Sequence, residues 1–170
     1  MPPTLVVFWV FAAAAIGSAL LCITRRNTVA SALWLVVTLF DMAALFVMLD
    51  AQFIAVLQVL VYAGAIMVLF LFVIMLLNLG PGTASDVKGP AGLAVATLLA
   101  AAFGIQLLAL LRSGPPAAAA GDMARTVQSE GMVGAVARPL FTVYLVPFEI
   151  TSVLLLAAIV GAVVLAKRQL

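Results

Sequence analysis

The sequence predicts an all-α integral membrane protein with five transmembrane helices. Hydrophobic residues make up 67% of its 170 residues and charged residues only 8%, whereas soluble domains carry about 25% charged residues. The hydrophobic residues gather into five runs, each long enough to cross a ~30 Å hydrocarbon layer at about 1.5 Å per residue. We therefore expect a single membrane domain over residues 1–170, in contact with lipid.

The first predicted helix covers residues 4–23. No Lys or Arg precedes it, and Arg25 and Arg26 follow it, so it differs from a signal peptide and is expected to be retained. The second helix covers residues 29–49 and begins after Asn27, a residue that commonly caps helix N-termini.

The third predicted helix covers residues 53–78 and ends before a stretch rich in Gly and Pro. Only Asp50, Ala51 and Gln52 separate it from the second helix. Such a short connection makes the two helices an antiparallel hairpin. The fourth predicted helix covers residues 91–111, which are rich in Ala and carry no charge.

The fifth predicted helix covers residues 140–166 and contains Pro147 and Glu149. A helix that starts at Pro139 would place Glu149 deep in the span and Pro147 at a kink, whereas a start at Pro147 would place Glu149 in the first turn. We favour the longer helix, because the residues before Pro147 are apolar. The preceding segment, residues 113–138, is expected to be an outer loop, irregular or partly helical outside the membrane.

The basic residues predict the orientation. Cytoplasmic loops of membrane proteins carry an excess of Lys and Arg. With the N-terminus outside and the C-terminus in the cytoplasm, the cytoplasmic side holds five basic residues and the outer side three. The cytoplasmic set is Arg25, Arg26, Lys88, Lys167 and Arg168, and the outer set is Arg112, Arg125 and Arg138.

Within the third helix, Gln58 and Tyr62 are the polar residues that a simple anchor does not need. They are four positions apart, so a regular α-helix places them on one face, with Ala65 and Leu69 continuing the stripe. Tyr62 is also readily explained as a packing residue whose hydroxyl finds a neighbour.

Gly64 stands between Ala63 and Ala65 in the middle of the same helix. A glycine there permits close backbone approach and weakens the helix locally. It predicts either close packing of helices or a point where the helix changes conformation.

Two carboxylates fall within predicted spans, Asp41 and Glu149. A carboxylate near the middle of the bilayer costs ~2.5–3.5 kcal/mol on insertion scales, so it usually faces protein or water and marks an ion path. Asp41 shares one stripe of the second helix with Ser31 and Thr38. The alternatives are a neutral Asp41 bonded to a neighbouring helix and, for Glu149, a capping role; neither protonation state follows from the sequence.

The composition excludes several kinds of site. The chain has no His and a single Cys22, so it offers no disulfide framework, and its few carboxylates are dispersed. We find no nucleophile–base pair and no phosphate loop. The net charge of +2 and the scattered basic residues argue against nucleic-acid binding.

Two segments resemble one known family. Residues 58–78, QVLVYAGAIMVLFLFVIMLLN, resemble the third helix of the subunit J family of NADH-quinone oxidoreductase, the bacterial counterpart of the mitochondrial chain 6 subunit of respiratory complex I. Residues 147–157, PFEITSVLLLA, followed by Gly161, Ala162 and Val163, resemble the last helix of that family. The turn at residues 25–32 and the five-helix topology agree with it.

The resemblance implies a non-redox subunit in the proton-translocating membrane arm of complex I, located in the bacterial inner membrane. It implies partners among the other membrane-arm subunits, especially subunits K, A, H and N. It also implies that FMN, the iron–sulfur clusters and quinone are bound by other subunits and that this chain binds no cofactor. The quinone and the electron donor do not follow from it.

The resemblance further implies a role for the third helix. In this family, that helix can carry a π-bulge beside the residues corresponding to Tyr62 and Gly64, and its relaxation is thought to gate proton or water access. Gln58, Ala63 and Ala65 belong to the same implied gating segment. Some members carry carboxylates near the positions of Gln52 and Gln58; the amides here release no proton, which favours gating over proton carrying and points to subunit K as the carrier.

Two other functions fit a five-helix membrane protein with a polar seam. One is a subunit of a related cation/proton antiporter or of a membrane-bound hydrogenase. The other is a scaffold that holds neighbouring helices in register. The intact VYAGAIMVLFLFV block and the PFE segment favour the quinone-reducing family over both.

Overall fold

The structure, a computed structural model, describes residues 3–77, 89–113 and 117–167, and within these ranges every regular element is a helix. Five helical stretches are long and apolar enough to cross a membrane. This confirms the predicted all-α membrane protein with five spans. The chain, expected to be a single membrane domain, divides into two compact units, Met1–Pro115 and Pro116–Leu170.

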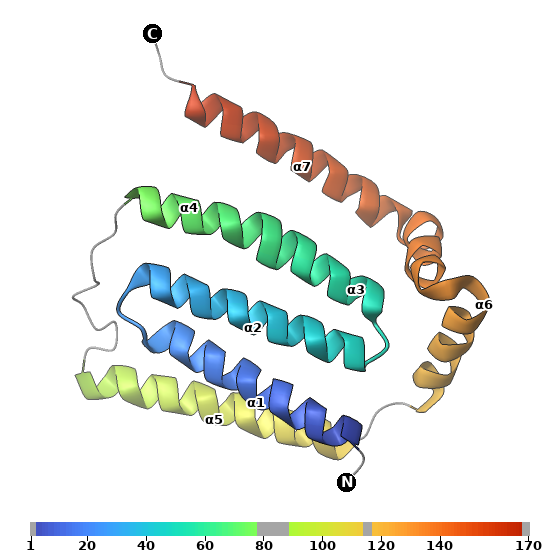
Figure 1. Ribbon diagram of the computed structural model, residues 1–170, viewed down its shortest axis with the longest axis horizontal. Coiled ribbons are helices and arrows are strands. Elements are labelled where there is room, and N and C mark those ends of the chain that lie inside the picture. The colour runs from blue at the N-terminus through green and yellow to red at the C-terminus, as the bar shows by residue number, and fades with distance from the viewer. Residues whose placement is uncertain (1–2, 78–88, 114–116, 168–170) are drawn as a thin grey trace. The chain divides into compact units, whose positions relative to one another are not determined.

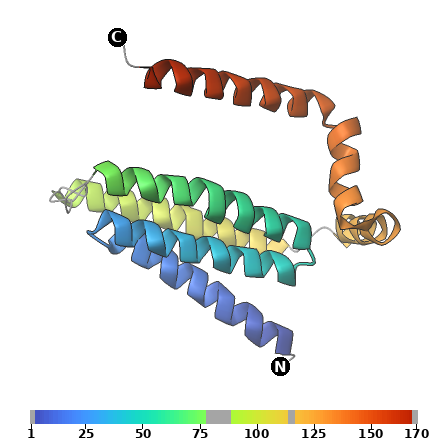
Figure 2. The same cartoon turned by 45° about the horizontal axis from the view of Figure 1, so that its top comes forward.

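The first two spans, α1 (Pro3–Thr24) and α2 (Thr28–Met48), form an antiparallel hairpin (Figure 2). Asn27 caps α2, as predicted. Its side-chain oxygen accepts hydrogen bonds from the backbone N–H groups of Val29, at 3.0 Å, and Ala30, at 3.1 Å. The cap supplies partners for N–H groups that the helix itself leaves unpaired, and so allows a short turn.

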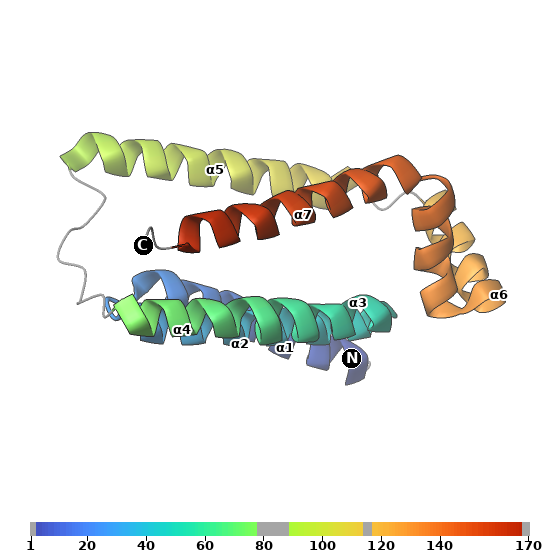
Figure 3. The ribbon, with the colours of Figure 1, turned by 90° about the horizontal axis from the view of Figure 1, so that it is seen from above.

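The third span is a continuous helix made of α3 (Gln52–Leu57), η1 (Gln58–Ile66) and α4 (Met67–Leu77), as Figure 3 shows. The turn before it has Asp50 at a φ of 57°, a left-handed conformation that Asp tolerates better than most residues. In the same turn, the Ala51 N–H donates to the Phe46 carbonyl at 2.9 Å. The predicted end of this helix at residue 78 lies outside the described residues.

In the first unit, α2 lies between α1 and the third span (Figure 1). The buried apolar cluster joins Ala32 of α2 to Met67 and Ile74 of α4. Small and large side chains therefore alternate across this contact, which lets the two helices approach closely. Partly buried apolar side chains surround the cluster: Leu35, Val36, Leu39 and Leu71.

The fourth span, α5 (Gly89–Ser113), and the fifth, α7 (Leu145–Ala166), expose their large apolar side chains within their respective units. Leu98 of α5 and Leu155 of α7 are examples. A helix that is apolar on all sides is stable in lipid or beneath neighbouring helices.

The segment between these two spans is helical over most of its length. Helix α6 (Ala117–Thr142) covers most of residues 113–138, for which the sequence left an irregular or a partly helical form open. The helix bends at Gly131, whose φ is 75°, and the bend is visible in Figure 1. Arg138 forms an ion pair with Glu130 across the bend. The helical form is favoured because Ala is the strongest helix former.

The fifth span is shorter than predicted. It begins at Leu145 instead of residue 140, because α6 ends at Thr142 and two non-helical residues follow. The preference for a helix starting at Pro139 was therefore wrong. Pro147 lies in the first turn of α7, where its missing N–H group has no helical partner to lose. Glu149 lies two residues further on, near the N-terminal end of α7.

Candidate functional site

Helix α2 has two different faces. One face carries Ser31, Thr38 and Asp41, and each of these side chains hydrogen-bonds to a residue of α1. The other face carries Ala32 and Ala43, which are buried. Because residues seven and ten positions apart stay close on an α-helix, the predicted stripe of Ser31, Thr38 and Asp41 does share one face.

The polar face of α2 meets Ser18 of α1. The Ser18 hydroxyl lies 2.8 Å from the Thr38 hydroxyl and 3.4 Å from Oδ2 of Asp41. Ser18 is only 3% exposed and Asp41 only 8%. Nearer the turn, the Cys22 thiol lies 3.6 Å from the Ser31 hydroxyl, which also donates to the Cys22 carbonyl. The two helices are thus joined by hydroxyl groups along their shared length.

The third span is wound as a π-helix over the nine residues of η1, Gln58–Ile66. At its end, the backbone N–H of Met67 donates to the carbonyl of Tyr62, five residues earlier. The π-bulge that the family resemblance implied is therefore present and extends over the whole Gln58–Ala65 segment. Such windings are rare, are usually a single turn long and occur frequently at functional sites.

The π winding changes which side chains face α2. Gln58 is 8% exposed and Ala63 only 4%, whereas Tyr62 is 53% exposed. Gln58 and Tyr62 therefore do not share a buried face, and the predicted stripe through Ala65 and Leu69 was wrong. The reason is the added residue in each π turn. Side chains five positions apart lie on the same face of a π-helix, whereas in an α-helix the side chains on one face are three or four positions apart.

Gly64 lies where the π winding brings the backbone close. A Cβ atom built on Gly64 would stand 3.2 Å from the carbonyl oxygen of Val59, tighter than ordinary van der Waals contact. No side chain from another helix crowds this position within the described residues. The glycine therefore fits the winding of its own helix rather than a helix–helix contact.

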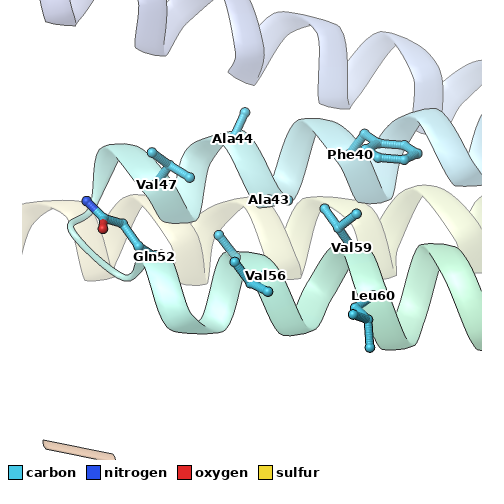
Figure 4. Close-up of a pocket in the computed structure, with 9 residues that line it drawn as sticks. Phe40, Ala43, Ala44, Val47, Gln52, Val56, Val59 and Leu60 are labelled. Atoms are coloured by element: carbon cyan, nitrogen blue, oxygen red, sulfur yellow. The ribbon is translucent and has the colours of Figure 1, made fainter. Parts of the chain in front are cut away.

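An apolar groove of about 560 Å³ lies between α2 and the first part of the third span, beside α3 and the start of η1. Figure 4 shows Val59 pointing toward α2, which contributes Phe40, Ala44 and Val47 to the opposite wall. Because α2 and α3 supply most of its walls, the groove adjoins η1 only at its start. Its remaining lining residues are Ala43, Gln52, Ala55, Val56 and Leu60.

Glu149 belongs to the second unit, near the start of α7, and is exposed there. Its backbone carbonyl accepts a hydrogen bond from the Ser152 hydroxyl at 2.7 Å. Near it, the rings of Phe141 and Phe148 pack edge to face with centroids 5.1 Å apart, which joins α6 to α7.

Sequence reasoning missed Ser18 as the partner of Asp41. A signal was present: in an antiparallel hairpin, residues equally distant from the turn face each other, and counting outward from residues 25–27 pairs Ser18 with Trp34, about one helical turn before Thr38. Among the described residues, no three side chains of His, Cys, Asp or Glu lie close enough together to hold a metal ion.

Comparisons with known proteins agree over nearly the whole chain. Residues 18–165 match the family described as NADH-ubiquinone/plastoquinone oxidoreductase chain 6. The chain is 37% identical over 165 residues to the NAD(P)H-quinone oxidoreductase chain 6 of Leptolyngbya boryana, covering 97% of this chain and 80% of the relative. It is 36% identical over 171 residues to the NADH-quinone oxidoreductase subunit J of Pseudomonas aeruginosa, covering 95% and 96%. It is 30% identical over 169 residues to the F(420)H(2) dehydrogenase subunit J of Methanosarcina mazei, covering 96% and 90%.

Proposed function

Because this chain belongs to the chain 6 and subunit J family of NADH-quinone oxidoreductase, we propose that its third span gates the coupling of quinone reduction to proton translocation. The chain is a membrane-arm subunit of that enzyme complex and carries no redox chemistry of its own. The family relationship does not favour an antiporter or hydrogenase subunit.

The observation that carries the proposal is the nine-residue π-helix with Gly64 inside it. A π winding is less stable than an α winding, so a long π segment persists only where surrounding contacts support it. Gly64 supports it by leaving space for the Val59 carbonyl oxygen. We therefore propose that the segment also adopts an α winding, separated from the π winding by a small free energy.

A change from π to α winding would turn everything after it. Loss of the added residue of one π turn rotates the following helix by about 100°, the angle that one residue occupies in an α-helix. The buried positions of Ala63, Met67 and Ile74 would then pass to the residues one place earlier, Tyr62, Ile66 and Val73. These three side chains are half exposed in the π form.

Tyr62 is the polar group that this rotation would bring to the face of α2. In the π form its side chain is 53% exposed, so the phenol lies outside the helix contact. Gln58 precedes the turning part and stays buried. Its amide group does not ionise, so we propose that Gln58 orients water or Tyr62. We assign the proton-carrying role to subunit K.

The proposal also includes the setting of the chain. We place the N-terminus outside and the C-terminus in the cytoplasm of a bacterial inner membrane, on the distribution of Lys and Arg. Other subunits of the complex are its partners, and among them we propose subunits K, A, H and N. FMN, the iron–sulfur clusters and quinone belong to other subunits, which agrees with a chain that has no His and one Cys.

The gating proposal is tested with Gly64→Ala and Gly64→Val in the assembled complex. A side chain at this position crowds the Val59 carbonyl in the π form, so Ala should shift the ratio of the two windings toward the α form. Valine shifts it further, because a branched Cβ stiffens the helix. Proton uptake and NADH:quinone reductase activity are measured together in membrane vesicles.

We expect the proton-to-electron ratio, or the coupled activity, to fall in the order wild type, Gly64→Ala, Gly64→Val, while the complex still assembles. Tyr62→Phe removes only the hydroxyl group and should also lower the proton-to-electron ratio or the coupled activity. Gly104→Ala is the matched control, because a Cβ there meets nothing within 4 Å. If the proton-to-electron ratio and the coupled activity are unchanged in all Gly64 and Tyr62 variants of an assembled complex, the gating proposal is wrong and the scaffold function is favoured.

A further inference from the structure

The buried Asp41 and Ser18 and the partly buried Thr38 form a cluster, here called the hydroxyl–carboxyl cluster, that the gating of the third span does not use. Asp41 lies about 20 Å along α2 from Thr28, at 1.5 Å per residue, and so well inside the span. The cluster is built by two helices, since Ser18 comes from α1. Among the described residues, Ser18 and Asp41 are two of the three buried polar side chains, and Gln58 is the third.

Within the described part of the first unit, no cation lies close to Asp41. The helices that pack against α2 are α1 and the third span, and neither contains Lys, Arg, Asp or Glu. Their titratable side chains are Cys22, which is hydrogen-bonded to Ser31, and Tyr62, which is half exposed. Arg25 and Arg26 lie at the hairpin turn and Asp50 at the opposite end of α2. Only hydroxyl groups therefore stand beside this carboxyl group.

The hydrogen bonds of the cluster have two consistent arrangements. When the carboxyl oxygen of Asp41 beside Ser18 is protonated, its O–H donates to Ser18, Ser18 donates to Thr38 at 2.8 Å or to the Ala15 carbonyl at 3.1 Å, and Thr38 donates to the Trp34 carbonyl at 3.0 Å. When Asp41 is ionised, Ser18 turns to donate to Oδ2 at 3.4 Å and Thr38 donates to Ser18. Each hydroxyl changes its acceptor while the heavy atoms stay in place.

The chain of hydroxyls ends at the Trp34 carbonyl, which is an acceptor only and passes no proton on. In the described residues, no hydrogen bond reaches Oδ1 of Asp41. Oδ1 is therefore the carboxyl oxygen at which a proton enters and leaves, and a half-turn of the carboxyl group brings that proton beside Ser18, where the two hydroxyls adapt to its presence. The cluster stores a proton and does not conduct one through to the other side.

We propose that Asp41 is a proton-loading site of the membrane arm, with Ser18 and Thr38 as positioning residues that stabilise both of its protonation states. The proton is taken up and released at Oδ1, toward water or a neighbouring subunit, and no bond other than O–H forms or breaks. This role depends on membership of the complex and not on gating at Gly64.

The test is difference infrared spectroscopy of the purified complex between two pH values, with Asp41→Asn and Ser18→Ala. The C=O stretch of a protonated carboxyl group should disappear in Asp41→Asn. It should persist but change frequency in Ser18→Ala, where one hydrogen bond is lost. Asp50→Asn is the matched control: it removes an exposed carboxylate at the end of α2, and Asn tolerates the φ of 57° equally well.

Coupled turnover provides the second measurement. We expect it to fall at least about tenfold in Asp41→Asn, as loss of a positioned proton-transfer group does, and to recover in part in Asp41→Glu. A carboxyl band unchanged by Asp41→Asn, or a turnover of that variant within twofold of wild type, would overturn the proposal. If Asp41→Asn does not assemble, the Ser18→Ala spectrum decides: a shifted band supports the site, and an unshifted band overturns it.

Discussion

The two contacts of α2 are held by different forces. Toward α1, hydroxyl, thiol and carboxyl groups form directional hydrogen bonds, such as Ser18 with Thr38 at 2.8 Å. Toward the third span, Ala32, Met67 and Ile74 pack without polar groups. A directional bond tolerates little rotation, whereas apolar packing depends on shape and allows a second arrangement of similar energy. We therefore expect the α1–α2 hairpin to be the fixed part of the unit, and we propose that the third span is the part that turns.

The largest expected effect breaks the apolar contact. Ile74→Ala removes a buried side chain and should destabilise the attachment of the third span by about 2 kcal/mol or more. Val73→Ala, next to it but half exposed, should cost much less. The temperature at which the purified complex loses this subunit is the measurement. Equal losses for both variants would show that neighbouring subunits, rather than α2, hold this face.

A smaller effect is expected at the end of the polar contact. Asn27→Ala removes the cap of α2 and should cost about 1 kcal/mol, whereas Asn27→Asp keeps an acceptor oxygen and should cost less. Protease sensitivity of the loop at residues 25–27 in detergent reports on the hairpin. An Ala variant as resistant as the Asp variant would contradict the capping role.

The smallest effect sharpens the comparison. Ser18→Ala and Thr38→Val each remove one hydroxyl of a shared hydrogen bond, and such bonds within membranes average about 0.6 kcal/mol. The double variant should therefore cost less than the sum of the single variants by about that amount, in a thermal-stability cycle on the complex. Strict additivity would mean that the two hydroxyls, 2.8 Å apart, do not interact.

The spans could be predicted because hydropathy over a bilayer thickness decides where helices lie. The Asn27 cap and the stripe of Ser31, Thr38 and Asp41 followed from local rules that hold for any α-helix. The face of Tyr62 could not be predicted, because the periodicity argument assumes 3.6 residues per turn and η1 does not have it. The choice between the two windings depends on contacts distant in sequence.

The start of the fifth span was also mispredicted for a physical reason. The apolar residues before Pro147 fit a membrane helix in composition, so hydropathy did not separate them from the span. The break at residues 143–144 instead follows from hydrogen bonding: the N–H groups of Val143 and Tyr144 both donate to the Pro139 carbonyl, and α6 closes there.

The turn at Asp50 and Ala51 has a mechanical consequence. It binds the start of the third span to the end of α2, through Ala51 N–H to Phe46 at 2.9 Å and Asp50 N–H to Val47 at 3.1 Å. A rod clamped at one end transmits torsion only toward its free end. Any gain or loss of a residue per turn in η1 therefore leaves α3 still and delivers the whole twist to α4, at the opposite side of the membrane.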